Sequence, residues 1–361
     1  MTISGWSERD LIARIRARLP PPPDWVLVGI GDDAAVVEPE RNRVDVLSVD
    51  ALVEGIHFER AFVPPDAIGH RALAVNLSDL AAMGAQPRVA LLSLALPPRL
   101  PIADFDGLVT GVASLAERSR VHVIGGNLTR SPGPLMIDIT VTGSVKARRV
   151  LERRGARPGD HLYVSGTIGT AAAGLAMLKR KLATTEDAED TEEQSSSGND
   201  STSVSSVSSV VESSAVNKCI ERYLRPEPRV RLGLMLSRNR AASACMDLSD
   251  GLSDAVYQVA EASGVGVRIE AGALPIEACA REALAAGGGD PIVEAITGGD
   301  DYELLVAVRP QTRSRLAAAM RHGGVALTRI GVCTDDRAIL LCGDGADQPL
   351  PRGGYRHFGR A

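Results

Sequence analysis

Paired carboxylates recur in this sequence at points where the chain turns into an apolar run. The stretch GIGDDAAVV places Asp32 and Asp33 between a Gly-x-Gly turn and a strand-like segment, and TGGDDYELLVAV repeats this design at Asp300 and Asp301. Either motif alone could be an Asp-rich turn, because Asp and Gly both suit tight turns. Together they raise the question of what neutralises so much negative charge beside a core.

A third stretch, LSVDALVEGIHF, alternates polar and apolar residues in the manner of a strand. Because strand side chains alternate between the two faces of a sheet, Ser48 and Asp50 should share one face. Leu47 and Val49 should share the opposite face, which we expect to pack into a core. A charge held beside such a core is costly, since taking an ion out of water costs several kcal/mol.

Two further motifs add polar groups at positions set by secondary structure. VNLSDLAAMG has helical spacing, which places Asn76, Asp79 and Met83 on one helix face. In IGGNLTR, Asn127 follows a predicted strand and two glycines, where the backbone can approach a ligand closely.

The stretch DLSDGLSD would align Asp247, Asp250 and Asp254 on one face if it were helical. Like charges at this spacing destabilise a helix unless a cation neutralises them. Mg²⁺ prefers carboxylate, hydroxyl and water oxygens and commonly shares its site with substrate phosphates. A zinc site is not indicated, because His57 and His70 are isolated and no cysteine is close in sequence. Each acid alone could be solvated or could cap a helix, but together the clusters predict metal-assisted phosphate chemistry.

The length and composition suit a protein of two domains. The 361 residues fit two domains of about 100–200 residues each, and 44% of them are hydrophobic. A formal net charge of −5 disfavours nucleic acid as a partner, since nucleic-acid-binding proteins usually carry a basic stripe. Five cysteines without a CxxC pair indicate a reducing, cytoplasmic setting. We expect neither a signal peptide nor a membrane span, because no apolar stretch approaches the required length of about 18 residues.

Local patterns divide the chain into two α+β units, residues 1–150 and 151–361. The first is expected to contain helices over 7–19, 67–83 and 105–119, and strands over 25–28, 34–37, 44–49, 89–96, 121–124 and 135–145. The Arg-, Gly- and Pro-rich stretch 153–160 marks the boundary, after which a strand over 162–165 restarts the pattern.

Two segments of the second unit are singled out by their composition. GTIGTAAAGLAML leads into a helix whose glycine-rich start could bind phosphate, although helix–strand packing is the favoured interpretation. Residues 184–216 combine an acidic block with a Ser-rich tract and almost no bulky side chain other than Val. Such a segment cannot bury enough surface to offset its ordering entropy, so we predict a disordered insert.

Taken together, these motifs resemble the thiamine-monophosphate kinase family, within the superfamily of aminoimidazole ribonucleotide synthase-like ATP enzymes. The resemblance rests on GIGDDAAVV, DALVEGIHF, AVNLSDLAAMGAQP, GGN, RRGARPGD, DLSDGLSD, GGDDYEL and GYRHF, which span nearly the whole chain except the Ser-rich tract. It implies a two-domain α+β fold whose N-terminal domains pair into a homodimer with a shared β-barrel-like sheet. It also implies transfer of the γ-phosphoryl group of ATP to thiamine monophosphate, the final step of thiamine diphosphate biosynthesis.

The same resemblance implies roles for individual residues. Several Mg²⁺ ions would be held by Asp33, Ser48, Asp50, Asp79, Asn127, Asp247 and Asp250. ATP contacts would be made by Gly126, Asn127, Arg149 and Ser249. Acceptor contacts would be made by His57 and Asp300, with Tyr355 as an aromatic candidate.

Three positions depart from the family pattern. Asn127 stands where the family often has Asp, so one metal ligand is neutral here, and Asp300 is a shorter acid than the usual Glu. Arg352 occupies a position that is commonly aromatic, so that Tyr355 or Phe358 would have to supply any stacking on the acceptor.

The chemistry implied by the resemblance agrees with the residues present. An acceptor that is already a phosphate oxygen needs no general base, and phosphoryl transfer depends mainly on positioning and charge neutralisation. We therefore expect no covalent nucleophile.

Three sister activities and one different class are the alternatives. A selenophosphate synthetase would need a reactive cysteine or selenocysteine in its N-terminal region, whereas the first cysteine is Cys219. A hydrogenase-maturation carbamoyl dehydratase would end in cysteine, whereas this sequence ends HFGRA. An aminoimidazole ribonucleotide synthase fits NLSDLAAMGAQP and GGDDYEL less well. A non-catalytic nucleotide-binding module would have no need of so many costly acids.

Overall fold

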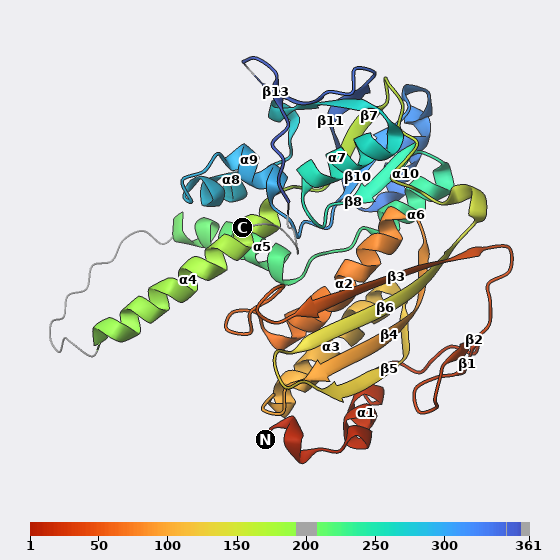
Figure 1. The fold of residues 1–361 in the computed structure, drawn as a ribbon, viewed down its shortest axis with the longest axis vertical. Coiled ribbons are helices and arrows are strands. Elements are labelled where there is room, and N and C mark those ends of the chain that lie inside the picture. The colour runs from red at the N-terminus through yellow and green to blue at the C-terminus, as the bar shows by residue number, and fades with distance from the viewer. Residues whose placement is uncertain (193–207, 344, 355–361) are drawn as a thin grey trace.

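The chain folds around two β-sheets, each with helices packed against it. The structure is a computed structural model that describes residues 1–192, 208–343 and 345–354, without the side chains of 184–215. Figure 1 shows the sheet of the first half of the chain in the lower part of the view and that of the second half above it.

The first half forms a four-stranded mixed sheet in the order β3–β6–β4–β5, in which β4 and β5 are parallel and the other neighbours antiparallel. Two long helices, α2 and α3, cover one face of it (Figure 1). The elements of this half are η1 (Ile3–Gly5), α1 (Glu8–Arg16), β1 (Val26–Val28), β2 (Val36–Val37), β3 (Val44–Val53), α2 (Pro65–Ala82), β4 (Gln86–Leu96), α3 (Ile102–Ser119), β5 (His122–Arg130), β6 (Met136–Val145) and η2 (Ala147–Arg149).

The second half forms a seven-stranded mixed sheet in the order β13–β12–β9–β11–β7–β10–β8. Its strands are β7 (His161–Ser165), β8 (Ala244–Asp247), β9 (Gly266–Glu270), β10 (Leu304–Val308), β11 (Leu327–Thr334), β12 (Ile339–Cys342) and β13 (Gln348–Pro349). Its helices are α4 (Thr170–Glu192), α5 (Ser208–Leu224), α6 (Val230–Asn239), α7 (Leu252–Ser263), η3 (Ala271–Ala273), α8 (Ala278–Ala285), α9 (Pro291–Thr297), η4 (Pro310–Thr312) and α10 (Arg313–Gly323).

Helix α2 is the element that joins the two halves. Almost its whole surface is buried, because it packs on the first sheet and α3 on one side and on α6 and β8 on the other. Ala-rich sequence suits such a helix, since small side chains let several neighbours approach at once. Two polar residues of α2, Arg71 and Ser78, accordingly reach Asp300 and Asp247 of the second half.

The expectation for Leu47 and Val49 was wrong, although the alternation itself was right. These side chains are 68% and 56% exposed on the uncovered face of the sheet. Ser48 and Asp50 instead lie on the covered face, where the Ser48 hydroxyl donates a hydrogen bond to Asp79 of α2. Alternation separates the two faces of a strand, but only the tertiary packing decides which face is covered.

The predicted insert also differs from the structure at both margins. Helix α4 continues to Glu192 and α5 begins at Ser208, so residues 184–192 and 208–216 are helical. Residues 193–207 lie outside the described part of the chain. The prediction considered only apolar burial, whereas lengthening a helix that is already formed adds one hydrogen bond per residue without a new nucleation cost.

Strand β5 is longer than predicted and contains Asn127 rather than ending before it. It pairs with β4 from Val89–His122 to Leu96–Arg130. Gly126 makes this possible, because its φ is +155° and an added Cβ would lie 1.8 Å from the carbonyl oxygen of Leu92. The two strands can run this closely side by side only with glycine at that position.

Two findings bear on the setting of the protein. Within the described residues, no helix is long and apolar enough to cross a membrane. All five cysteines are free thiols, although the sulfurs of Cys219 on α5 and Cys279 on α8 lie 3.2 Å apart.

Candidate active site

A cluster of carboxylates lies where α2 meets the second sheet. Asp79 of α2 accepts a hydrogen bond from Ser48 of β3, and the neighbouring Ser78 donates a 2.7 Å hydrogen bond to Asp247 at the end of β8. Asp50 of β3 completes the cluster. Three elements that are distant in sequence thus bring three predicted metal ligands together.

The cluster carries more negative charge than its surroundings compensate. Burial, followed by the charges of Asp79, Asp247, Asp138 and Asp250, raises the pKa of Asp50 to about 7. The same interactions show that these four carboxylates lie close enough to act on Asp50 electrostatically.

Its two deeper members are affected in the same way. Burial and the charge of Asp79 raise the pKa of Asp247 to about 7, although Ser78 and Arg153 oppose that shift. Burial also raises the pKa of Asp79, against the hydrogen bond from Ser48 and the charge of Arg153. A cation bound here would relieve repulsion that the protein otherwise sustains.

The DLSDGLSD motif is not the continuous helix that would align its three acids. Asp247 ends β8, Asp250 lies in the following loop, and α7 begins only at Leu252. Gly251 adopts a φ of +101°, which breaks any helical path between them. The motif is a strand–loop–helix turn, so Asp247 and Asp250 approach the cluster from its strand end while Asp254 belongs to α7.

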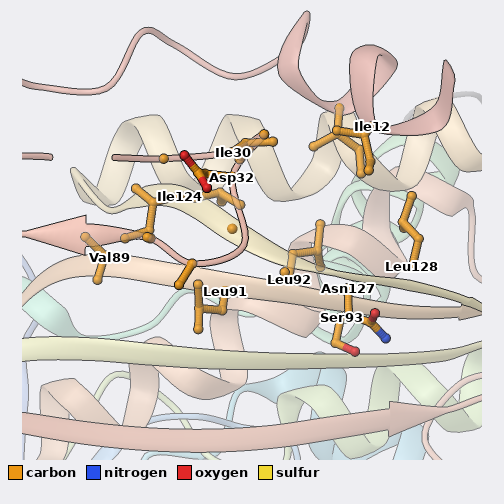
Figure 2. Close-up of a pocket in the computed structure, with 18 of the residues that line it drawn as sticks. Ile12, Ile30, Asp32, Val89, Leu91, Leu92, Ser93, Ile124, Asn127 and Leu128 are labelled. Carbon is orange, nitrogen blue, oxygen red and sulfur yellow. The ribbon is translucent and has the colours of Figure 1, made fainter. Parts of the chain in front are cut away.

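A cavity of about 1150 Å³ lies on the face of the first sheet that is opposite to α2 and α3. Figure 2 shows its lining, with Ile12 of α1 and Asp32 of the loop between β1 and β2 above the strands that carry Ser93 and Asn127. Asp33, Gly126 and Asn127 line it, as predicted for ligand contacts, whereas Ser48, Asp79 and Asp247 do not. The predicted metal ligands therefore form two groups, one in the carboxylate cluster and one in the cavity.

Asp138 of β6 connects the two groups and was not predicted from the sequence. It lines the cavity, and its charge is one of those that raise the pKa of Asp50. In the sheet register it lies beside Ser93, which in turn lies beside Asn127. The signal was present, because a carboxylate interrupts the apolar strand sequence MIDITV, but one isolated acid did not stand out from the paired ones.

The loop before β10 holds the second pair of carboxylates in different environments. Asp300 accepts hydrogen bonds of 3.0 Å from Arg71 of α2 and from the Tyr302 hydroxyl, and its amide donates a 2.8 Å bond to the carbonyl of Ser249. Asp300, which is predicted to contact the acceptor, is thus hydrogen-bonded directly to Ser249, which is predicted to contact ATP. Asp300 and Tyr302 both have positive φ values, of 69° and 49°, and such strain is typical of functional sites.

Asp301 instead points into the protein. Its carboxylate accepts hydrogen bonds from the amides of Gly169 and Ala171, at 2.7 and 3.3 Å, and burial raises its pKa to about 7. The glycine-rich start of α4 is thereby occupied by the protein's own carboxylate. This supports the packing interpretation of GTIGTAAAG rather than a phosphate site.

The remaining predicted residues lie around these features. The ring nitrogen Nδ1 of His57 accepts a 3.0 Å hydrogen bond from the amide of Val53. Arg149 ends η2, and its carbonyl accepts a 2.8 Å bond from Ser237. Tyr355 lies outside the described residues, so its predicted role stays a prediction.

The Arg352 departure has a local explanation. Its guanidinium lies 4.3 Å from the centre of the Tyr257 ring, on α7. An arginine at this position stacks on an aromatic ring of the chain itself.

The donor chemistry fits Mg²⁺, although the described residues do not include three His, Cys, Asp or Glu side chains already gathered around one metal position. Carboxylate and hydroxyl oxygens are all that the cluster offers, which is the donor set of a hard cation. Burial raises the pKa of Asp50, and repulsion by the neighbouring carboxylates raises it further. A divalent ion would draw these oxygens together and remove that repulsion.

Comparison with known proteins gives a consistent result. The family models for AIR synthase related proteins match residues 31–145 with their N-terminal domain and residues 157–341 with their C-terminal domain, which agrees with the two-domain α+β architecture. Thiamine-monophosphate kinase from Escherichia coli strain K12 is 37% identical over 353 residues, covering 97% of this chain and 98% of that protein. The corresponding protein from Bacillus subtilis is 33% identical, covering 92% and 93%.

Solved structures agree with the sequence relatives. Thiamine-monophosphate kinase from Stenotrophomonas maltophilia has a TM-score of 0.77 and 35% identity, with 94% of this chain and 98% of that chain covered. A structure described as AaThiL complexed with AMPPCP and TMP has a TM-score of 0.70, 29% identity and 99% coverage of both chains. The hydrogenase maturation protein HypE of Escherichia coli, at 21% identity and a TM-score of 0.71, shares the fold alone. On these matches, the chain belongs to the thiamine-monophosphate kinase family of AIR synthase related proteins.

Proposed function

We propose that the chain transfers the γ-phosphoryl group of ATP to thiamine monophosphate by direct, magnesium-assisted in-line displacement, giving thiamine diphosphate and ADP. The observation that carries this proposal is the convergence of Asp50, Asp79 and Asp247 at the junction of the two sheets. A family relative has been solved with AMPPCP and TMP, which supports both substrates for this chain.

Two groups of residues would hold Mg²⁺ in this proposal. Asp50, Asp79 and Asp247, with Ser48 and Asp250, belong to the carboxylate cluster, and Asp33 and Asn127 belong to the cavity. Bound Mg²⁺ would neutralise the phosphate charges of two polyanionic substrates and so let them approach each other.

The protein's own contribution is placement and exclusion of water. Helix α2 holds Asp79 at the packed junction of the two sheets, and Ser48 and Ser78 fix the carboxylates of Asp79 and Asp247. Oriented carboxylates need little reorganisation during the reaction, which is the main source of electrostatic catalysis.

The cavity is the proposed nucleotide site. Its volume of about 1150 Å³ is ample for ATP, since small-molecule sites are commonly about 300–1000 Å³. Gly126 exposes its backbone there, and Asn127 offers both an amide donor and a carbonyl oxygen. Ser249 and Arg149 are proposed to complete the ATP contacts.

The acceptor needs no base from the protein. A phosphate oxygen of thiamine monophosphate is already ionised at neutral pH, so it can attack the γ-phosphorus directly. His57 and Asp300 are proposed to contact the acceptor, and we assign no covalent nucleophile.

Rival activities within the same fold differ in their acceptor. The test measures ADP release with Mg²⁺ and ATP in the presence of thiamine monophosphate, thiamine or an aminoimidazole ribonucleotide precursor. We expect release with thiamine monophosphate. Release only with the aminoimidazole precursor would favour the sister enzyme, and ATP binding without release in any mixture would favour a non-catalytic module.

We further propose that the chain acts in the cytoplasm as a homodimer that pairs through the uncovered face of the first sheet. Leu47, Val49 and Met136 share that face by the sheet register, and all three are exposed. An apolar patch of this kind is uncommon on a monomer and marks an interaction surface. A second copy of the sheet would supply the β-barrel-like arrangement that the family resemblance implies.

Placing two charges in the middle of this patch should give a monomer. The variant Leu47→Asp with Val49→Asp is expected to halve the mass measured by light scattering while keeping the far-UV circular dichroism of the parent. Leu27→Asp is the matched control, because Leu27 is equally exposed but lies on β1. A double variant with the parental mass would exclude this face as the dimer interface.

The Asn127 departure predicts a graded response to magnesium. Asn127→Ala loses both the carbonyl oxygen and the amide, so we expect activity to fall about tenfold or more, the usual cost of weakening a metal site. Asn127→Asp should stay active and reach half its maximal rate at lower Mg²⁺, because added charge strengthens cation binding. Initial rates across a Mg²⁺ titration give both quantities.

Thr129→Ala provides the control for that series, since Thr129 is exposed two residues further along β5. It should follow the parental titration. An Asn127→Ala variant that also follows the parental titration would place Asn127 outside the site.

A further inference from the structure

Arg71 of α2 is a buried cation whose charged partner lies in the other half of the chain. Its side chain is 1% exposed, and its only ion pair within the described residues is the 3.0 Å contact from Nη2 to Oδ1 of Asp300. Nη1 donates a hydrogen bond to the carbonyl oxygen of Tyr223, and the guanidinium lies 4.4 Å from the centre of the Tyr223 ring. Arg71 thus ties α2 to α5 and to the loop before β10.

A buried guanidinium is stable only when it is paired, because an uncompensated charge in the interior is strongly unfavourable. The ion pair therefore neutralises the buried guanidinium of Arg71 and, at the same time, restrains the carboxylate of Asp300. The planar, forked guanidinium fixes direction as well as distance, which a flexible lysine would not do.

The Asp300 carboxylate is held asymmetrically. Both of its described hydrogen bonds, from Arg71 and from the Tyr302 hydroxyl, go to Oδ1. Within the described residues Oδ2 accepts no hydrogen bond, and the side chain is 31% exposed. One oxygen thus fixes the carboxylate, and the other has no hydrogen-bond donor among the described residues.

The backbone conformation of Asp300 also indicates that its orientation is fixed by its surroundings. Asp300 has a φ of +69°, a conformation that aspartate adopts at some cost. The amide bond to Ser249 and the anchoring of Asp301 at the start of α4 hold the loop in place on both sides. The contacts of Arg71 and Tyr302 then set the direction of the side chain itself.

We propose that Arg71 is a positioning residue for the phosphoryl acceptor, which it serves by orienting Asp300 from across the domain junction. The free oxygen of Asp300 would accept a hydrogen bond from an amino group, or face the cationic ring, of a nitrogen-heterocyclic phosphate. This inference rests on the proposed function, because it takes Asp300 as an acceptor contact. It adds that the first domain controls the acceptor site through a residue that touches neither substrate.

The test separates acceptor binding from nucleotide binding. Arg71→Met is expected to raise the KM for thiamine monophosphate about tenfold or more, while the KM for ATP changes by less than about twofold. Arg71→Lys keeps the charge but not the planar, forked guanidinium. Its KM for the acceptor should therefore fall between those of the parent and of Arg71→Met. Isothermal titration of thiamine monophosphate, with a non-hydrolysable ATP analogue present, should show the same order of affinities.

A double-mutant cycle tests whether Arg71 acts through Asp300. If it does, Arg71→Met should add little to the acceptor KM once Asp300→Asn is present, whereas independent residues would have multiplicative effects. Arg225→Met is the matched control, since Arg225, which directly follows α5, pairs with Asp66 of α2 but not with Asp300. Its acceptor KM should stay within about twofold of the parent.

The outcomes are distinguishable. Multiplicative effects in the cycle, an unchanged acceptor KM, or an equal rise in both KM values would overturn the positioning role. A parent protein that does not use thiamine monophosphate would instead overturn the proposed function. If Arg71→Met does not fold, Arg71→Lys and Tyr302→Phe decide the matter, because both should weaken acceptor binding without exposing an unpaired charge.

Discussion

Replacing Asp50 by asparagine is expected to reduce kcat by about 100- to 1000-fold, the usual cost of removing one preorganised electrostatic group. Asp50 lies among four other carboxylates that act on it, and burial together with these charges raises its pKa to about 7. A cation bound among these carboxylates would favour the ionised form of Asp50 and relieve the repulsion. Asparagine keeps the shape and removes the charge that would hold Mg²⁺.

The same variant should be at least as stable as the parent when metal is removed. In the chelated parent, an ionised Asp50 is disfavoured by burial and by Asp79 and Asp247, and a neutral asparagine side chain at this position would relieve both costs. Added Mg²⁺ should raise the melting temperature of the parent more than that of the variant. The measurement is kcat together with thermal melting in EDTA and in excess Mg²⁺.

Two results would contradict this expectation. Parental kcat in Asp50→Asn would place the cluster outside the reaction. A large loss of stability in EDTA would show that the Asp50 carboxylate supports the fold rather than the metal. Asp45→Asn is the matched control, because Asp45 is an exposed acid on the same strand, and it should leave both quantities unchanged.

The largest loss of stability is expected from Glu303→Gln, at about 3–5 kcal/mol. Glu303 is fully buried and forms ion pairs with both Arg222 and Arg229, the latter through a 2.7 Å hydrogen bond from Nε. Its carboxylate also accepts a hydrogen bond from Ser165 on β7. Glutamine would leave two largely buried guanidinium groups without a counter-charge.

Urea denaturation measures the effect, with Glu221→Gln as the matched control. Glu221 pairs with Arg225 at 2.7 Å, but its side chain is 56% exposed, so this change should cost no more than about 1 kcal/mol. A Glu303→Gln variant within about 1 kcal/mol of the parent would show that the two arginines find other partners or water.

Local rules were reliable where the cause was local. The first helix was expected to begin at Ser7, and Ser7 is its N-cap: the Ser7 hydroxyl accepts a 3.3 Å hydrogen bond from the amide of Asp10, whose carboxylate accepts one in return from the Ser7 amide. The strand alternation around Ser48 was equally sound. The sequence did not show which face of the strand would be covered. The covering helix α2 comes later in the chain and leaves no signal in the residues of the strand itself.

The candidate site shows the same limit. Family resemblance supplied Asp50, Asp79 and Asp247, but nothing in the sequence states that β3, α2 and β8 meet at one junction. Asp138 and Arg71 were missed for that reason. Arg71 lies in an ordinary helical stretch, and only the folded chain brings it within 3.0 Å of Asp300.

The most direct test of the central claim compares two acceptors that differ by one phosphate group. The measurement is kcat/KM for thiamine monophosphate and for thiamine, with saturating ATP and Mg²⁺, following thiamine diphosphate and ADP together. The account predicts that thiamine monophosphate is preferred by at least about 100-fold, because free thiamine presents a hydroxyl that no assigned base deprotonates. Equal or better use of thiamine would contradict direct transfer to an ionised phosphate oxygen.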